Sequence, residues 1–336
     1  MPEEYQLVLR IADGTLLAFS LRGSIGCGGV LQGVALRRIA GSSAVSRLRA
    51  QLHCREIRSA DLDGILTLLR KGFPERPREY FVRALMRLTE HATPPGVPRY
   101  GYLMENHGAP VGVNLVIFSS IAGPDDTAIR GNVSSWYVEP AFRMYAPMLM
   151  SRTLSHANVT LLNVSPARHT WPILEKRGYR QFCGGQFIAV SRLAGRFFDV
   201  QVRSVSRELC AGDDLSPSEI ALLLAHARYG CLSVTCNTVS GRTPFVFARG
   251  WFPWKAFQVP CAVLAYCRDV EDFVRFAGPL GRYFASHGVA LVSIDSNGPI
   301  PGLRGRFVDW APRFFRGPHQ PRLGDLSYSE LVMFGL

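Results

Sequence analysis

The chain has 336 residues, enough for two domains of ordinary size, because a single core rarely grows beyond about 250 residues. Hydrophobic residues make up 47% of the chain and charged residues 19%, so a disordered or collagen-like protein is excluded. No stretch reaches the ~18 consecutive apolar residues of a transmembrane helix, so we expect a globular protein without a membrane span.

The net charge of +12 suggests a polyanionic partner, but the kind of cation weakens this interpretation. Only Lys71, Lys176 and Lys255 are lysines, and a bias in genomic base composition can produce so many arginines. No helix-turn-helix, zinc-finger or aromatic RNA-binding signature accompanies them. The sequence therefore argues against a nucleic acid and leaves a phosphate-bearing cofactor open.

The eight cysteines never occur as Cys-x-x-Cys, and no histidines with metal-ligand spacing lie beside them. Several lie in apolar runs, such as Cys261 in Pro260–Tyr266, where a small buried hydrophobe is the simpler interpretation. We therefore expect no metal, and reduced thiols in a cytoplasmic protein.

Residues 1–52 differ in composition from the rest of the chain and form an extension of uncertain role. Between Gly14 and Arg55 there is no Asp or Glu. The start Met1-Pro-Glu-Glu argues against a secretory signal. An organellar transit peptide, an accessory strand pair and a start codon assigned too far upstream all remain open.

After the extension, helical apolar spacing predicts a helix over 61–70. Runs at 100–105, 111–118 and 133–138 are typical of strands, and a short helix then leads into a strand at 159–161. A second helix begins at Ser216, with Pro217 at its first position and Glu219 three residues after the cap. Further strand-like runs follow it, at residues 231–236, 244–248 and 263–267.

These elements form an internal repeat. Arg143, Pro147, Ser155-His156 and Val159-x-Leu161 recur as Arg275, Pro279, Ser286-His287 and Val289-x-Leu291, and Arg275 follows Arg143 by 132 residues. Each copy predicts an α/β unit in which a helix connects two neighbouring parallel strands. Ligands of such sheets gather where the strands end and helices begin, which is near Val138–Pro147 in the first copy. We expect His156 and His287 to cap the connecting helices.

Residues 53–190 resemble the GNAT-type N-acetyltransferase superfamily. The resemblance covers Arg55–Asp61, Gly108–Phe118, Ser135–Arg143 and Thr160–Asn163, and it ends in Leu174-Glu-Lys-Arg-Gly-Tyr179, which is similar to that family's terminal Glu-Lys-x-Gly-aromatic signature. It implies a mixed α/β (α+β) sheet, present twice in tandem. The expected borders are an extension at 1–52, one GNAT-like domain at 53–195 and a divergent second domain at 200–336.

The resemblance also implies acyl-CoA or acetyl-CoA as co-substrate, with its pyrophosphate held by backbone amides in the loop after the central strand. The implied binding residues are Tyr137, Val138, Arg143, Tyr145, Ala146 and Met148 in the first copy, and Arg275, Gly278 and Gly281 in the second. The first copy departs from the family pattern, because Pro147 has no N–H to donate and Met148 is bulky. The loop of the second copy is at least as rich in glycine.

The family's frequent general acid, a tyrosine, falls on Leu174, which cannot protonate a leaving thiolate. Glu139, Asn163 and Asp295 are the candidate catalytic residues, with Ser165 and His169 near the same cleft. For Glu139 and His169, a solvated loop position is the simpler alternative. Of the neighbours Trp136 and Tyr137, only one can face the cleft.

The C-terminal tail, 310–319, is rich in arginine and aromatic residues, and an arm that closes the sheet explains it more simply than a phosphate clamp. Residues 325–334 resemble a final strand. We expect an acyltransferase that moves an acyl group from acyl-CoA or an acyl carrier protein to a small-molecule amine. The alternative is a catalytically inactive sensor or scaffold that binds an acyl thioester. The acceptor, the acyl length, the active copy and the oligomeric state stay open.

Overall fold

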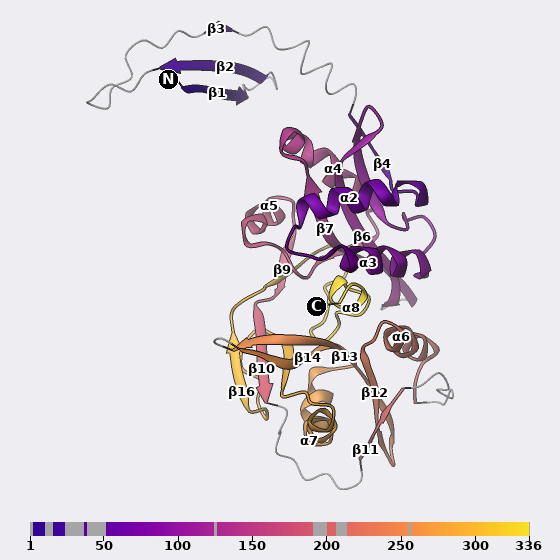
Figure 1. Ribbon diagram of the computed structural model, residues 1–336. Helices are drawn as coiled ribbons and strands as arrows, with labels where there is room; N and C mark the ends of the chain where they lie inside the picture. Colours follow the sequence, from indigo (N-terminus) through magenta and orange to yellow (C-terminus); the bar gives the residue numbers. More distant parts are fainter. Residues whose placement is uncertain are drawn as a thin grey trace, which may run out of the picture. The chain divides into compact units, whose positions relative to one another are not determined.

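The computed structural model describes residues 3–10, 16–23, 37–38, 52–123, 126–190, 200–205, 214–254 and 257–335 (Figure 1). The chain divides into two compact units, residues 1–53 with 105–109 and residues 54–104 with 110–336. The first unit holds an antiparallel sheet of β1 (Glu3–Arg10), β2 (Leu16–Gly23) and β3 (Arg37–Arg38). The rest of the predicted extension lies largely outside the described residues. The second unit contains the internal repeat and every candidate site residue.

The first large sheet has seven strands in the order β4-β5-β6-β7-β8-β17-β9. Strand β6 pairs antiparallel with β7, β7 pairs parallel with β8, and β17 pairs antiparallel with β8 and β9. The strands are β4 (Leu52–Glu56), β5 (Gly101–Asn106), β6 (Ala109–Gly123), β7 (Asp126–Val138), β8 (Val159–Asn163), β9 (Arg180–Cys183) and β17 (Arg313–Arg316).

Two pairs of helices pack on the faces of the first sheet. Helices α2 (Leu62–Gly72) and α3 (Arg78–Glu90) share a core cluster with Val113 and Leu115 of β6. Helices α4 (Ala146–Leu154) and α5 (Trp171–Lys176) contribute to a cluster with Val116 and Phe118. Because successive strand residues point to opposite faces, both faces are buried.

The second large sheet also has seven strands, in the order β11-β12-β13-β14-β15-β10-β16. Strand β14 pairs parallel with β15, and α7 (Val270–Ser286) connects the two. Helix α6 (Pro217–Arg228) begins with the predicted capping box of Ser216 and Glu219. The strands are β10 (Gly185–Val190), β11 (Gln201–Ser204), β12 (Leu232–Thr238), β13 (Gly241–Trp254), β14 (Phe257–Cys267), β15 (Leu291–Ser296) and β16 (Gly305–Val308).

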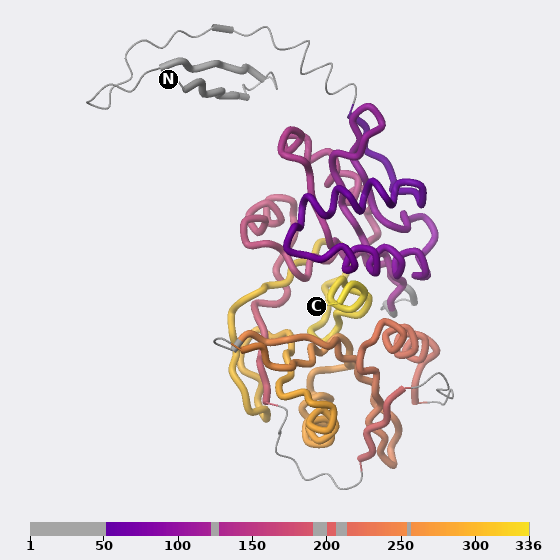
Figure 2. The backbone as a smooth tube through the Cα atoms, viewed as in Figure 1, coloured from indigo at the N-terminus to yellow at the C-terminus, as the bar shows by residue number. Residues whose placement is uncertain are grey.

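The two sheets exchange one strand with each other. Strand β10 precedes the other strands of the second sheet in sequence, yet it lies between β15 and β16 (Figure 2). Strand β17 follows every strand of the second sheet in sequence, yet it lies between β8 and β9 of the first. Both occupy the sixth place in their sheets, so the exchanged strands correspond to each other. Neither sheet is therefore made by one continuous segment, and the predicted domain borders stay a prediction.

The structure confirms the predicted unit of two parallel strands joined by a helix, because α4 connects β7 to β8 and α7 connects β14 to β15. The tail at 310–319 contains β17 and closes a sheet, as the simpler explanation predicted.

Two local predictions are wrong. Residues 325–334 form no strand beyond a single bridge from Asp325 to Tyr266, and their end is the short helix α8 (Glu330–Met333). The expected loop between Arg275 and Gly281 is helical, because α7 already begins at Val270, where Asp269 caps it.

Candidate active site

A bulge in β7 separates this strand from β8. Asn114 of β6 lies opposite Trp136 and Val116 lies opposite Val133, so β7 has one extra residue between them. The parallel ladder with β8 ends just before the bulge, at Asn132 opposite Leu162. Across the described ranges, residues 134–138 have no strand partner and no other backbone hydrogen bond on the side away from β6. We call this edge of β7, which has no strand partner beyond the end of the ladder, the opening of the first sheet.

The second sheet has the same bulge, but its opening is filled. Tyr266 lies opposite Val246 and Leu264 opposite Phe247, and the ladder with β15 ends just before, at Val263 opposite Ser293. The Leu326 N–H donates to the Ala265 carbonyl at 2.8 Å, and the Cys267 N–H donates to the Gly324 carbonyl at 2.9 Å. Residues 324–326 therefore occupy in the second sheet the edge that is open in the first.

The helices that follow the two central strands begin differently. The Asp269 side chain accepts a hydrogen bond from the Glu271 N–H at the start of α7, and Asp272 adds a further carboxylate there. A cavity of about 330 Å³ at this end is lined by the carboxylates of Asp269 and Glu271 and also by Arg268 and Arg322. The Asp269 carboxylate therefore already occupies this helix end as a cap.

The corresponding start in the first sheet carries no carboxylate in its first turn. After Val138 the chain forms a 3-10 helix, η2 (Pro140–Tyr145), and then α4. Arg143 on η2 is exposed, and Glu139, which directly precedes η2, is paired with Lys71.

The structure brings the implied cofactor residues of the first copy together at this place. Val138 ends β7, Arg143 and Tyr145 lie on η2, and Ala146 and Met148 lie in the first turn of α4. In the second copy, Arg275, Gly278 and Gly281 lie inside α7, and both glycines are buried. Their N–H groups bond within the helix, so they cannot form an amide cradle for phosphate.

Of the two aromatic neighbours near the end of β7, Tyr137 packs against the cluster formed with α2 and α3. Trp136 lies opposite Asn114, and Asn114 Nδ2 donates to Thr153 of α4, so Trp136 lies on the face of the sheet that α4 covers. The two rings therefore point to opposite faces, as strand geometry predicts.

The candidate catalytic residues lie on different elements. Glu139 forms an ion pair with Lys71 at 2.8 Å beside η2. Asn163 lies at the end of β8. Asp295 is only 2% exposed, and both its oxygens accept hydrogen bonds from Arg313, at 2.8 and 2.9 Å. An engaged carboxylate of this kind is an anchor more than a base. His169 is exposed.

The two repeated histidines behave differently. His287 Nδ1 contacts the Tyr283 carbonyl at 2.8 Å, which confirms the predicted cap of α7. His156 instead contacts the Tyr102 hydroxyl through Nε2 at 2.5 Å, and its ring lies near Phe118.

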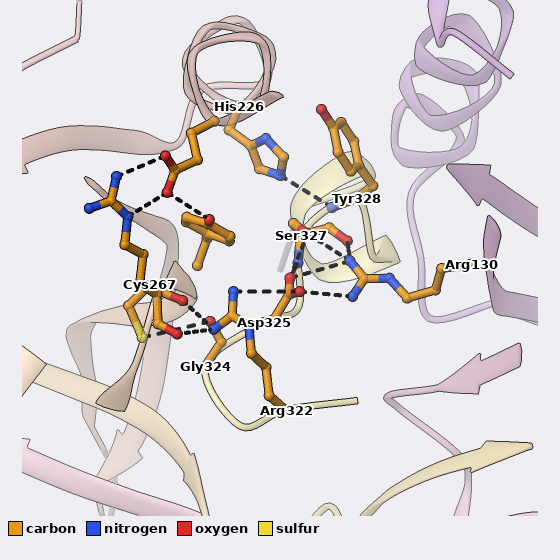
Figure 3. Close-up of polar contacts among 11 residues, drawn as sticks. Arg130, His226, Cys267, Arg322, Gly324, Asp325, Ser327 and Tyr328 are labelled. Carbon is orange, nitrogen blue, oxygen red and sulfur yellow. Dashed lines mark hydrogen bonds and ion pairs between the residues drawn. The ribbon is translucent and has the colours of Figure 1, made fainter. Parts of the chain in front are cut away.

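We name residues 322–334 the C-terminal segment, and buried polar contacts hold it to both sheets (Figure 3). Arg130 of β7 pairs with Asp325 at 3.1 Å and donates to the carbonyl and hydroxyl of Ser327, both at 2.6 Å. Although burial opposes it, the charges of Arg130 and Arg322 lower the pKa of Asp325 to about 2. The Tyr328 N–H donates to Nε2 of His226 on α6 at 3.2 Å.

Glu330 begins α8 and lies at the point where β7 and β8 stop pairing. Its carboxylate accepts hydrogen bonds from Asn132 Nδ2 and from Ser165 Oγ, the latter at 2.5 Å. The residue is 5% exposed, and burial raises its pKa, against the two hydrogen bonds that lower it. Asn132 Oδ1 and Ser329 Oγ are buried without a hydrogen-bond partner.

Sequence analysis missed Glu330 because the run from Asp325 to Phe334 resembled a strand. A usable signal existed, since Ser329 directly before Glu330 fits a helix cap followed by an acidic first turn. At the position of the family's tyrosine, Leu174 is buried on α5. In the part of the chain that the structure describes, no three His, Cys, Asp or Glu side chains form a group able to hold a metal. No described helix is both long and apolar enough to span a membrane.

No family model and no curated protein matches the chain. Among solved structures, a GCN5-related N-acetyltransferase from Anabaena variabilis matches 79% of this chain and 72% of its own, at 11% identity and a TM-score of 0.51. Others from Kribbella flavida and Sphaerobacter thermophilus match 79% of this chain at 14% and 13% identity, covering 70% and 94% of their own, with TM-scores of 0.46 and 0.40. With its mixed seven-stranded sheets, the chain therefore has the fold of the GCN5-related N-acetyltransferases.

Proposed function

We propose that this protein transfers an acyl group from acyl-coenzyme A to an amine, in the opening between β7 and β8. The observation that carries the proposal is the difference between the two bulges. The edge of β14 is covered by residues 324–326, whereas residues 134–138 of β7 keep one edge unpaired in the described structure. The second sheet then has a structural role, and each chain has one site.

Both ends of this opening suit an acyl thioester. At the helix end, exposed Arg143 and the carboxylate-free start of α4 favour a pyrophosphate. At the bulge, unpaired N–H groups of β7 can polarise a thioester carbonyl and stabilise the oxyanion that forms on attack. Bound acyl-coenzyme A would supply the activated acyl carbon.

Two features favour the rival function, a protein that binds an acyl thioester as a sensor or scaffold without catalysis. Pro147 removes one donor from the first turn of α4. Buried Leu174 provides no acid for the leaving thiolate. The thiol of coenzyme A has a pKa near that of cysteine, about 8.5. Coenzyme A can therefore leave as the thiolate, without an acid, and take its proton from water.

Calorimetric titration of the full chain with acetyl-coenzyme A, a long-chain acyl-coenzyme A and free coenzyme A tests the proposal. We expect one binding site per chain. Arg143→Ala should weaken binding about tenfold, since a charge-assisted phosphate contact is lost. Arg275→Ala is the matched control and should bind like the wild type, because Arg275 lies along α7 over the Phe276 ring.

Acyl transfer to a panel of primary amines, followed by release of the coenzyme A thiol, separates the two functions. Binding together with transfer supports the acyltransferase, and binding without transfer supports the sensor or scaffold. An absence of binding by every coenzyme A species would overturn both.

A further inference from the structure

We propose that a β-hairpin arm of the second sheet docks this protein on a surface of anionic lipid. The arm consists of residues 249–253 of β13 and 257–260 of β14, and we name it the aromatic arm. The proposal does not depend on acyl transfer, because the aromatic arm belongs to the second sheet and the opening belongs to the first.

The aromatic arm continues past the part of β13 and β14 that pairs with other strands. Strand β12 pairs with β13 only as far as Phe247, and β15 pairs with β14 only from Cys261 onward. Beyond these points the two strands of the arm pair with each other. Figure 1 shows this long hairpin, and a ring contact between Phe252 and Trp310, with centroids 5.5 Å apart, holds it to the segment after β16.

Side chains alternate along the β13 part of the aromatic arm, and the outward positions are largely apolar. Phe252 is half-buried against Trp310. Arg249, Trp251 and Pro253 point to the opposite side and are exposed, Trp251 to 65%. The solvent side of an antiparallel sheet usually carries polar residues. Trp251 and Pro253 therefore form a surface that suits contact with an apolar phase.

The other strand of the arm adds a second exposed ring. Phe257 is 73% exposed, and Trp310 at the base of the arm is 41% exposed. In the described part of the chain, the exposed Trp and Phe side chains are all found in this region. Rings of this kind are favoured at a membrane surface, where the ring contacts the acyl boundary and the indole N–H stays among the headgroups.

The charge around the aromatic arm favours an anionic lipid. The sequence has no Asp or Glu between Glu219 and Asp269, the stretch that contains the whole arm. Arg249 on the arm and Arg306 on β16 are exposed, and Asp309 opposes them in sign. Arginines near a membrane surface are attracted to anionic headgroups. The net charge of +12 adds to this attraction.

A second copy of the chain fits this surface less well than lipid does. An open strand edge can pair with a strand of another chain, but Pro253 has no N–H to donate to such a ladder. A two-fold contact between identical arms would also bring two copies of Arg249 together, and like charges repel.

The test measures co-sedimentation of the full chain with vesicles of phosphatidylcholine alone and of phosphatidylcholine mixed with phosphatidylglycerol. We expect the wild type to bind the mixed vesicles and to bind less as salt rises, because salt screens the attraction. Trp251→Ser should weaken this binding roughly tenfold, and the double variant Trp251→Ser with Phe257→Ser roughly a hundredfold, since each change removes a ring from the lipid. Both side chains are exposed, so both variants should unfold at the wild-type temperature.

Val239→Ser is the matched control, because Val239 is 104% exposed at the turn between β12 and β13. It removes an exposed apolar side chain outside the aromatic arm and should bind the mixed vesicles like the wild type. Arg249→Gln keeps the rings and should reduce the salt dependence of binding.

Failure of the wild type to bind the mixed vesicles would overturn the proposal. Equal binding by the wild type and the double variant would assign the attraction to net charge alone and remove the role of the arm. Analytical ultracentrifugation without lipid examines the second copy. A dimer of the wild type that the double variant dissociates would show that the arm joins two chains, against the proposal.

Discussion

Arg313 on β17 donates to both carboxylate oxygens of Asp295 on β15, at 2.8 and 2.9 Å, and both side chains are buried. Arg313 also donates to the Val164 carbonyl just after β8. One guanidinium therefore joins a strand of the first sheet to a strand of the second. Arg313 is the first residue of β17, the strand that the chain adds to the first sheet after completing the second. The ion pair with Asp295 therefore stabilises this exchange of strands.

Asp295→Ala should lower the free energy of unfolding by about 3–5 kcal/mol, because it leaves the Arg313 charge buried and unpaired. Urea unfolding followed by circular dichroism measures this. Glu139→Gln, which removes the exposed ion pair with Lys71, should leave the unfolding midpoint unchanged. Similar midpoints for Asp295→Ala and Glu139→Gln would contradict the anchoring role of Asp295.

The exchanged strands predict that neither half folds alone. A fragment of residues 53–195 lacks β17, so β9 at the edge of the first sheet loses its neighbour. A fragment of residues 200–336 lacks β10, so β16 loses its neighbour. We expect each purified fragment to unfold without a cooperative transition, and the coexpressed pair to copurify and unfold cooperatively. Cooperative unfolding of either fragment alone would show that the exchange is dispensable.

His226 should make stability fall in mild acid. Burial lowers its pKa from 6.5 to about 4, so the folded protein holds the ring neutral, with Nδ1 donating to the Leu222 carbonyl. Below pH 6.5 the ring of His226 binds a proton in the unfolded chain but stays neutral in the folded one. The stabilisation that neutral His226 contributes to folding is therefore complete above pH 6.5 and declines as the pH falls toward 4. The decline should reach about 3 kcal/mol.

His226→Gln should remove this part of the pH dependence, since an amide does not titrate. Unfolding free energies measured at several pH values between the two pKa values would show a shallower slope for the variant. Parallel curves for the variant and the wild type would show that His226 does not carry the effect.

Gly324 should tolerate no side chain. Its φ is +78°, and an added Cβ would lie 2.6 Å from the Cys267 sulfur, next to the contact that fills the second opening. Gly324→Ala should lower stability by about 2–4 kcal/mol, through left-handed strain and overpacking. Gly288 has a φ of +69°, and a Cβ added there would have no atom within 4 Å. Gly288→Ala should therefore lower stability by only about 1 kcal/mol. The midpoints of thermal unfolding of Gly324→Ala and Gly288→Ala are compared. Equal losses of stability in the two variants would show that packing at Gly324 does not matter.

The sequence by itself determined the elements whose signals are local. The Ser216 capping box, the apolar spacing of 61–70 and the repeated order around Arg143 and Arg275 predicted helices and parallel strand pairs that the structure confirms. These signals work because capping and periodicity act between residues a few positions apart. The same local view misjudged where α7 begins, because the repeat aligned Arg275 with a loop residue and gave no weight to Asp269 as a cap.

Only the tertiary structure decided which strands lie side by side and which polar groups meet. Asn132 and Glu330 are 198 residues apart, and β10 pairs with strands more than 100 residues away. Pairings of this kind depend on the whole sheet and on which edge remains open, and no local periodicity specifies them. The bulges of the two copies are alike, and the packing of residues 324–326 against one of them distinguishes the filled opening from the open one.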